Sequence, residues 1–186
     1  MKFLTLFLLL VLVTPVMAQR NSALTTGRIV DLTHAFDSQS VYWPTAEAFK
    51  LETDFEGMTD KGYFYSAYRY SAAEHGGTHL DSPVHFAKGR HTVDQIPLQQ
   101  LIGSAIVIDV TQQCAANADY QVSVADLQNW EKRNGRIALG TIVLLRTGFG
   151  KRYPDRAKYL GTDERGAEAV AKLHFPGLDP DAARWL

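Results

Sequence analysis

The sequence has few cysteines, no cluster of basic residues and no low-complexity tract, and each of these absences excludes a class of protein. It holds a single cysteine, Cys114, so no internal disulfide framework can form, and we expect this thiol to be buried rather than a metal ligand. Lysine and arginine form no cluster and the formal net charge is −1. The sequence therefore lacks the basic patch that is typical of a nucleic-acid-binding protein. With 46% hydrophobic residues and no low-complexity tract, the composition indicates a folded globular chain rather than a disordered one.

The N-terminal residues have the pattern of a secretory signal peptide. Lys2 supplies a positive start, an apolar run covers residues 3–13, and small residues follow at 16–18, where a signal peptidase cleaves. The run is too short to cross a bilayer core of ~30 Å, which disfavours the alternative of a membrane anchor. We therefore predict a signal peptide over residues 1–18 and a mature domain over residues 19–186. The location is then secreted, extracellular or periplasmic, with no membrane association after the signal is removed.

Several later segments have the apolar or aromatic patterns of β-strands. These segments are residues 28–33, 63–72, 103–110 and 141–147. The last two are continuous apolar runs, which favours strands covered on both faces.

Between these two runs the sequence predicts a helix. Ser123 fits the helix N-cap and Gly135 is a favoured helix stop, so strand, helix and strand form a βαβ unit. Residues 162–173 form a weaker helix candidate because Gly166 interrupts them. No repeat or linker is visible, so we predict a single α/β domain with β-rich material ahead of the βαβ unit.

Residues 74–86 carry the residue types that suggest a metal site. Three of the six histidines lie there, His75, His79 and His85, together with Asp81. Neutral imidazoles and a carboxylate are ligands that Zn²⁺ accepts, and three protein ligands leave a position open for water. The same donors also suit Mn²⁺ or Fe²⁺. The alternative is a chance cluster of histidines on a solvated loop.

The spacing of these residues favours an irregular turn followed by an extended piece. The glycine pair at 76–77 makes a regular helix between His75 and His79 costly. Beyond the turn, His79 and Asp81 would point to the same side of an extended segment. Such a backbone would bring three ligands together and leave His85 nearby but separate. The helical zinc-protease motif does not apply, because no Glu lies between His75 and His79.

The same segment carries a family resemblance. Residues 75–85 read His-Gly-Gly-Thr-His-Leu-Asp-Ser-Pro-Val-His and resemble the His-x-Gly-Thr-His-x-Asp-x-Pro-x-His signature of the cyclase family, with every fixed position matched. That family includes bacterial-type kynurenine formamidases and isatin hydrolases. Other family-like segments are residues 30–34, 42–44, 145–149 and 175–180, so the resemblance runs from about residue 28 to the end.

The resemblance implies a role for each residue of the signature. It makes His75, His79 and Asp81 the ligands of one or two divalent ions, Zn²⁺ or Mn²⁺. His85 corresponds to the catalytic acid/base histidine of the family. Trp43 corresponds to an aromatic residue that lines the substrate pocket, with ordinary core packing as the alternative.

For three further residues, His34, His91 and Arg146, we expect a structural role rather than a catalytic one. For His34 we expect a structural hydrogen bond rather than a part in catalysis. His91 fits a solvated loop. Arg146 fits a residue that fixes a neighbouring loop, with substrate contact as the less favoured role.

The function implied by the resemblance is metal-dependent hydrolysis of a C–N bond outside peptides. The substrate would be a small aromatic formamide, as for a kynurenine formamidase (arylformamidase) in tryptophan catabolism. A divalent ion lowers the pKa of its bound water to ~7 and so supplies hydroxide as the nucleophile, while His85 would act as the acid/base. An isatin-hydrolase-like lactam hydrolase is the alternative within this chemistry. A non-catalytic secreted metal-binding fragment is the alternative outside it.

The resemblance also implies a fold and an assembly. The fold would be a swivelling β/β/α cyclase-like domain in a homo-oligomer that binds a small-molecule substrate. Family members continue past the Pro-Gly-Leu segment at residues 176–178 into further strands, whereas this sequence ends at Leu186. We therefore expect the last strands to be missing. Asp179 and Pro180 are favoured at a helix start, which fits either a short terminal helix or a chain cut short.

Overall fold

The computed structural model of the protein describes residues 27–186, and the predicted signal peptide over residues 1–18 lies outside this part. The chain divides into two compact units, residues 1–33 and 34–186. In the described part of the first unit, residues 27–33 are all exposed and form no strand. The strand predicted at residues 28–33 is therefore wrong, because this apolar segment has no partner strand to pair with among the described residues.

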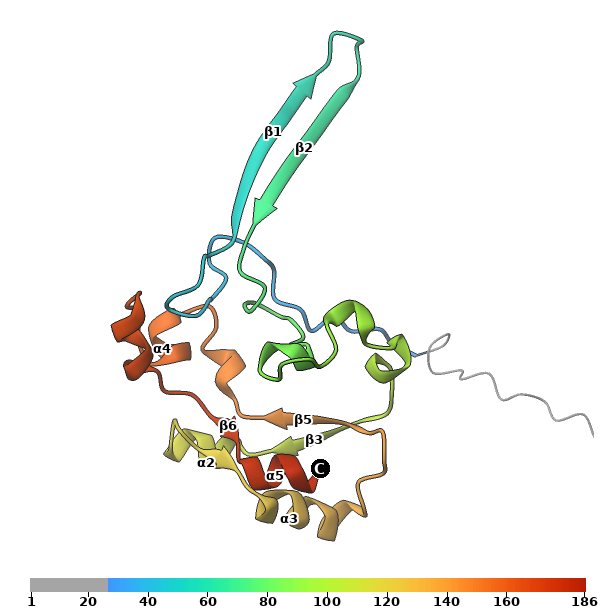
Figure 1. Cartoon of the computed structure of the whole chain (residues 1–186), viewed down its shortest axis with the longest axis vertical. Helices are drawn as coiled ribbons and strands as arrows, with labels where there is room; N and C mark the ends of the chain where they lie inside the picture. The colour runs from blue at the N-terminus through green and yellow to red at the C-terminus, as the bar shows by residue number, and fades with distance from the viewer. Residues whose placement is uncertain (1–26) are drawn as a thin grey trace, which may run out of the picture. The chain divides into compact units, whose positions relative to one another are not determined.

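The second unit begins with a long antiparallel hairpin. Strand β1, Lys50–Met58, pairs with strand β2, Phe64–Ser71, with one irregularity between Thr53 and Phe55. This confirms the strand predicted at residues 63–72. Figure 1 shows the hairpin extending away from the other strands of this unit. Its apolar side chains are largely exposed, including Tyr70 at 75%.

A parallel pair of strands forms the centre of the predicted βαβ unit. Strand β3, Ala105–Asp109, pairs in register with strand β5, Ile142–Arg146. The two strands were expected to be covered on both faces, and this is wrong for the described residues. Val107 is 49% exposed and Leu144 is 43% exposed, because only the opposite face of each strand packs against the core.

Helix α3, Val124–Asn134, connects these strands and confirms the predicted helix. The Ser123 side chain accepts from the Asp126 backbone N–H, and the Asp126 side chain accepts from the Ser123 backbone N–H. This reciprocal cap satisfies two N–H groups that the first turn of a helix leaves free. At the other end the helix stops at Gly135, as predicted.

Short elements close the core around α3. Helix α2, Thr111–Ala116, follows β3, and strand β4, Gln121–Val122, pairs in parallel with strand β6, Gly177–Leu178. Helix α5, Pro180–Trp185, begins at the predicted cap, where the Asp179 side chain accepts from two backbone N–H groups. The buried core joins these elements through Ile108, Val110, Cys114, Val122, Leu127, Phe149 and Ala182. The lone cysteine is thus a core residue, as expected.

The region between β5 and β6 differs from the prediction. Helix α4, Arg156–Leu160, was not predicted, and residues 162–173 contain only a 3-10 helix at Ala167–Lys172. The Gly166 N–H donates to the Pro44 carbonyl, 3.0 Å away, rather than to a helical carbonyl. This long-range hydrogen bond prevents a continuous helix. The remaining 3-10 helices are Pro83–His85, Val93–Gln95, Leu98–Leu101 and Phe149–Lys151.

One contact positions the histidine-rich loop on this framework. Tyr42 forms an isolated antiparallel bridge with Gly76, and its ring lies directly against that glycine. A Cβ atom at position 76 would meet the ring at 2.2 Å, a distance that van der Waals contact does not allow. Tyr42 itself is 1% exposed. The loop therefore needs a glycine here, for close approach of the backbone to a buried ring.

No helix among residues 27–186 combines the length and the apolar composition that crossing a membrane requires.

The substitution Leu127→Ala tests whether the buried core around α3 stabilises the fold. Leu127 is completely buried in α3, so the substitution leaves a cavity, and we expect the free energy of unfolding to fall by about 2–5 kcal/mol. The control is Leu139→Ala, since Leu139 is fully exposed. Urea denaturation measures both variants, and equal losses would contradict the assignment of Leu127 to the core.

The close contact at position 76 is tested by Gly76→Ala. The added methyl group must displace the Tyr42 ring, and overpacking of this kind typically costs about 1–3 kcal/mol. We therefore expect a lower Tm for Gly76→Ala than for Gly150→Ala, whose Cβ would meet nothing within 4 Å. Thermal unfolding followed by circular dichroism makes the comparison, and an unchanged Tm for Gly76→Ala would argue against the packing of Tyr42 on the loop.

Candidate metal centre

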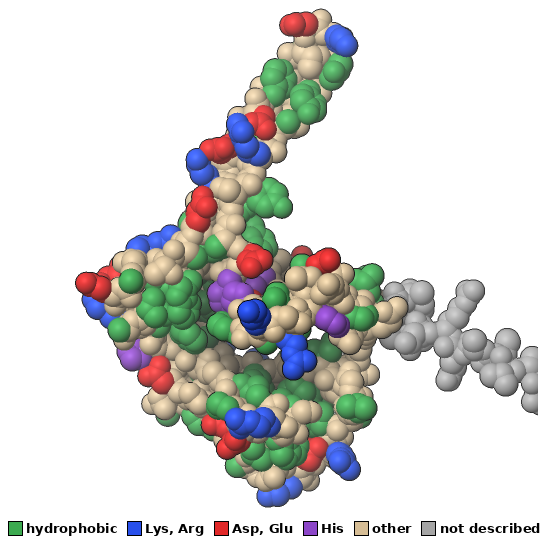
Figure 2. Space-filling model, in the orientation of Figure 1, with side chains coloured by type: hydrophobic (Ala, Val, Ile, Leu, Met, Phe, Trp, Pro, Cys, Tyr) green, Lys and Arg blue, Asp and Glu red, His purple; other side chains and the backbone are tan. Residues whose placement is uncertain are grey.

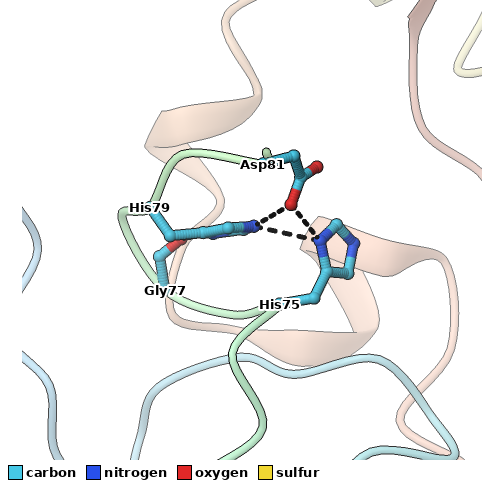
Figure 3. Close-up of polar contacts among 4 residues, drawn as sticks. All are labelled: His75, Gly77, His79 and Asp81. Atoms are coloured by element: carbon cyan, nitrogen blue, oxygen red, sulfur yellow. Dashed lines mark hydrogen bonds and ion pairs between the residues drawn. The ribbon is translucent and has the colours of Figure 1, made fainter. Parts of the chain in front are cut away.

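The three predicted ligands lie on one irregular loop. Residues 75 to 82 contain no helical turn, as the glycine pair predicted, and Gly77 adopts a left-handed backbone with φ of 64°. The chain reverses there, because glycine reaches this conformation without the steric cost of a side chain. His75 and His79 are thereby turned toward each other, and Asp81 reaches the same point from beyond them (Figure 3).

The three side chains present their donor atoms to one another at nearly equal distances. His75 Nδ1 lies 2.9 Å from Asp81 Oδ1, His79 Nε2 lies 3.1 Å from the same oxygen, and the two nitrogens are 3.0 Å apart. Zn²⁺ binds such atoms at ~2.0–2.2 Å, so one ion can contact all three. Among the described residues this set is the one group of three or more histidine, cysteine or acidic side chains with that geometry.

The hydrogen bonds of His79 indicate why a cation fits this point. His79 Nδ1 lies 2.9 Å from the Gly77 carbonyl oxygen, which can only accept, so Nδ1 carries the proton. The Nε2 atom of the neutral ring then presents a lone pair, and the ionised carboxylate of Asp81 presents another. In this neutral form the two lone pairs would repel each other across 3.1 Å, and positive charge removes the repulsion, supplied either by a proton on Nε2, which makes the contact an ion pair, or by a metal ion. The Gly77 carbonyl also fixes the ring orientation, as outer partners of metal-binding histidines commonly do.

Asp81 is held in the charged form that a metal ligand needs. The hydrogen bond with His75 is the main cause that lowers the pKa of the Asp81 carboxyl below its ordinary value, and the charges of the three nearby histidines act in the same direction. Burial opposes this effect but does not cancel it. Asp81 therefore stays ionised over a wider range of acidity than an isolated carboxyl.

His85 lies beside the ligand set but outside it, as the spacing predicted. Its ring stacks on His75 with the centroids 4.9 Å apart and an interplanar angle of 25°. Its backbone belongs to the 3-10 helix Pro83–His85. Within residues 27–186 neither ring nitrogen of His85 has a hydrogen-bond partner, which leaves both nitrogens available for proton transfer. Figure 2 shows a group of histidine side chains near the middle of this face and other histidine side chains apart from it.

A cavity of about 270 Å³ adjoins the ligands. His75, His79 and Trp43 contribute to its wall. The Trp43 ring lies 6.5 Å from the His75 ring and makes an edge-to-face contact with Phe175 at 6.1 Å. Trp43 is only half-buried, so it is not an ordinary core residue. This places an aromatic-lined space directly beside the candidate metal position.

His34, His91 and Arg146, for which we expected structural roles, lie outside the candidate metal site. The His34 backbone N–H donates to the Thr78 hydroxyl at 2.9 Å, and the His34 ring stacks on Tyr153 at 4.2 Å. His91 is exposed, and its backbone carbonyl accepts from Val84. Arg146 lies 3.7 Å from Asp109 across the strand pair. None of these side chains joins the ligand set among the described residues.

Several aromatic residues that line the cavity were not predicted from the sequence. Tyr42, Phe149, Tyr153 and Phe175 come from separate segments of the chain and meet only in the folded structure. Tyr42, Phe149 and Phe175 do fall inside family-like segments, at residues 42–44, 145–149 and 175–180, and this was the one available signal. The aromatic content of the sequence does not indicate which rings share a cavity.

Comparison with known proteins supports the family first suggested by the histidine motif. The Cyclase family model, described as "Putative cyclase", matches residues 30–186. Isatin hydrolase from Roseibium aggregatum is 31% identical over 166 residues, covering 81% of this chain and 61% of the relative. Kynurenine formamidase from Bacillus mycoides is 23% identical over 168 residues, covering 83% of this chain and 72% of the relative. Kynurenine formamidase from Polaromonas naphthalenivorans is 30% identical over 91 residues, which are 49% of this chain and 40% of that relative.

Solved structures agree with this result. Isatin hydrolase A from Labrenzia aggregata, bound to benzyl benzoate, superposes with a TM-score of 0.73 at 32% identity, covering 89% of this chain and 66% of that one. Isatin hydrolase A from Ralstonia solanacearum gives 0.71 at 32% identity, covering 89% and 65%. The chain thus spans less than two thirds of the length of these isatin hydrolases. The mixed α/β fold with small sheets is confirmed, and the chain belongs to the Cyclase family.

Proposed function

We propose that this protein is a metal-dependent hydrolase that cleaves the C–N bond of a small aromatic amide. One observation carries the proposal. Three ligand atoms, from His75, His79 and Asp81, lie within 3.1 Å of one another at the wall of an aromatic-lined cavity. A metal centre next to an apolar space with few polar groups is the usual form of a small-molecule site.

The proposed ion is Zn²⁺ or Mn²⁺, held by these three residues. Such an ion supplies Lewis acidity and an activated water molecule at neutral pH. The donor set accommodates one ion, and the described residues contain no second group of three ligands. Two imidazoles and a carboxylate do not distinguish Zn²⁺ from Mn²⁺, since both accept these ligands.

Different residues would bind the substrate and transfer the proton. Trp43 and Phe175 would hold the aromatic ring of the substrate against the cavity wall. His85 would accept a proton from the attacking water and deliver it to the departing nitrogen. The water oxygen bonds to the carbonyl carbon, the C–N bond breaks, and the proton completes the amine. The position of His85 against His75 supports this role, because it lies next to a ligand and is not itself one.

Two amide classes are candidates, a cyclic lactam of the isatin type and an aryl formamide of the N-formylkynurenine type. The lactam is favoured by the comparisons, because the isatin hydrolase match combines 31% identity with 81% of this chain. The formamidase matches have either lower identity or shorter coverage. The formamide stays as the second candidate, because hydrolysis of either bond needs the same centre.

The ligand assignment is tested by His79→Ala. Removal of one of three ligands should lower the bound Zn²⁺ or Mn²⁺ to well below one equivalent, as measured by inductively coupled plasma mass spectrometry on dialysed protein. The matched control is His174→Ala. His174 is also an exposed histidine paired with a carboxylate, Asp119 at 2.8 Å, but lies outside the ligand set. Equal metal contents in the two variants would refute the proposed centre.

The role of His85 is tested by His85→Ala. We expect an unchanged metal content and a fall in turnover of about 10²–10⁴-fold, the usual contribution of a positioned acid/base. Hydrolysis of isatin and of N-formylkynurenine, followed by absorbance, measures the effect. His91→Ala serves as the control because His91 is an exposed loop histidine. Unchanged turnover in His85→Ala would remove this residue from the mechanism, and metal binding without turnover in the unmodified protein would favour a metal-binding role alone.

A further inference from the structure

The loop between the two imidazole ligands contacts one distant segment at every position. The loop positions are 76–78, and the distant segment is residues 34–42, which we call the support segment. At the first position, Gly76 bridges to Tyr42 and packs against its ring. The other two positions have contacts of their own, with different residues of the support segment. The backbone between the ligands is therefore held by one part of the chain.

Phe36 covers the turn at the second position. A Cβ atom at Gly77 would meet Phe36 Cε1 at 2.7 Å and Cζ at 3.0 Å, so the ring lies directly against this left-handed glycine. The Gly77 N–H also donates to the Val41 carbonyl oxygen at 3.5 Å. The carbonyl oxygen of the same glycine accepts from His79 Nδ1. Phe36 therefore acts on the His79 ring through a single intervening residue.

Thr78 ties the third position to the support segment through its side chain. Its hydroxyl oxygen accepts a hydrogen bond from the His34 backbone N–H at 2.9 Å, across 44 positions of sequence. Thr78 directly precedes His79, so this hydrogen bond restricts the backbone from which the imidazole projects. The contact is separate from the packing of Phe36, because it uses a different atom of the support segment.

The support segment has a fixed shape of its own. Ser40 is buried, and its hydroxyl donates to the Ala35 carbonyl oxygen at 3.1 Å and accepts from the Asp37 N–H at 2.9 Å. The Ser40 N–H donates to the Asp37 carbonyl oxygen at 3.1 Å. The Asp37 carboxylate accepts from the Gln39 N–H at 2.7 Å. These hydrogen bonds fix the turn without any contribution from the ligand loop.

The ligand loop is much less able to hold a shape by itself. Two successive glycines lie in it, at positions 76 and 77, and glycine loses more conformational freedom on folding than any other residue. If an ion had to order this loop, the cost of ordering would weaken its binding, whereas a loop already in the binding conformation avoids that cost. The contacts with the support segment supply this order.

We propose that Phe36 and Thr78 are positioning residues of the metal centre, which hold the glycine pair in the conformation in which His75, His79 and Asp81 converge. This rests on the proposed function and extends it to residues that do not touch the ion. With the loop held on the support segment, the three donor atoms lie within 3.1 Å of one another. The support segment then sets the affinity of the centre for its metal.

Phe36→Leu and Thr78→Val test the two residues separately. The first keeps an apolar side chain but removes the ring, and the second keeps the branched shape but removes the oxygen that accepts from His34. We expect each to weaken Zn²⁺ binding by about 10- to 100-fold, the usual effect of losing an outer partner of a ligand. Competition with a chromophoric chelator measures the Kd on dialysed protein. Thr78→Ser keeps the hydroxyl and should retain the affinity of the unmodified protein.

Matched substitutions on the hairpin provide the controls. Phe55 is exposed to nearly the same extent as Phe36, 41% against 44%, and its ring stacks on Tyr65 at 5.8 Å. The Thr59 hydroxyl also forms hydrogen bonds with backbone groups, those of Tyr63. Phe55→Leu and Thr59→Val remove the same chemical groups away from the ligand loop, so the Kd for Zn²⁺ should not change.

The absorption spectrum of bound Co²⁺ distinguishes positioning from general packing. Its d–d bands report the geometry of the ligand set, so Phe36→Leu and Thr78→Val should shift them, whereas the two hairpin variants should not. A role in packing alone predicts a lower Tm with an unaltered Zn²⁺ affinity and an unaltered Co²⁺ spectrum.

Failure of this inference and failure of the proposed function give different results. If the unmodified protein binds Zn²⁺ and Phe36→Leu or Thr78→Val binds it as tightly with the same Co²⁺ spectrum, the positioning role of that residue is overturned while the metal centre stands. Equal weakening in Thr78→Ser and Thr78→Val would exclude the hydroxyl as the group responsible. If the unmodified protein binds no Zn²⁺, or binds it equally well after His79→Ala, the metal centre itself fails, and the inference fails with it.

Discussion

Two imidazole nitrogens and one carboxylate oxygen meet at a single point, within 2.9–3.1 Å of one another. Positive charge stabilises this arrangement, either as protons on the imidazoles, which pair them with Asp81, or as a metal ion that all three atoms can contact. The loop keeps the arrangement because its backbone is fixed on both sides. The Tyr42 ring packs against Gly76, and Gly77 reverses the direction of the chain. The Gly77 carbonyl oxygen accepts a hydrogen bond from His79 and so orients its ring. The candidate site therefore depends on close approach of the backbone to one buried tyrosine.

The structure separates the elements that provide stability from those that carry the site. Helix α3 and strands β3 and β5 contribute much of the apolar core, whereas the ligands lie on a connecting loop. This is the common division of labour in which loops carry function on a packed scaffold. Phe149 belongs both to the core and to the cavity wall. Tyr42 joins the loop to α4, since its ring contacts Gly76 and its backbone carbonyl accepts a hydrogen bond from Arg156, the first residue of α4.

The elements that could be predicted from the sequence are those with strong local signals. Helix α3 has a capping residue, an N3 carboxylate and a terminal glycine, and it forms as expected. The prediction failed where a distant contact overrides the local pattern. Residues 162–173 do not form one helix, because the Gly166 N–H binds Pro44 from far away in the chain. Residues 28–33 have the apolar, β-branched residues of a strand but no partner strand among the described residues.

The sequence by itself determined the candidate ligands, their order and the loop that holds them, because the glycines, histidines and aspartate lie within seven consecutive positions, 75–81. It also determined the family, through a motif in which every fixed position is present. Only the tertiary structure decided what lies opposite the ligands. The cavity combines rings from positions 42, 149, 153 and 175, and no local rule relates residues that far apart.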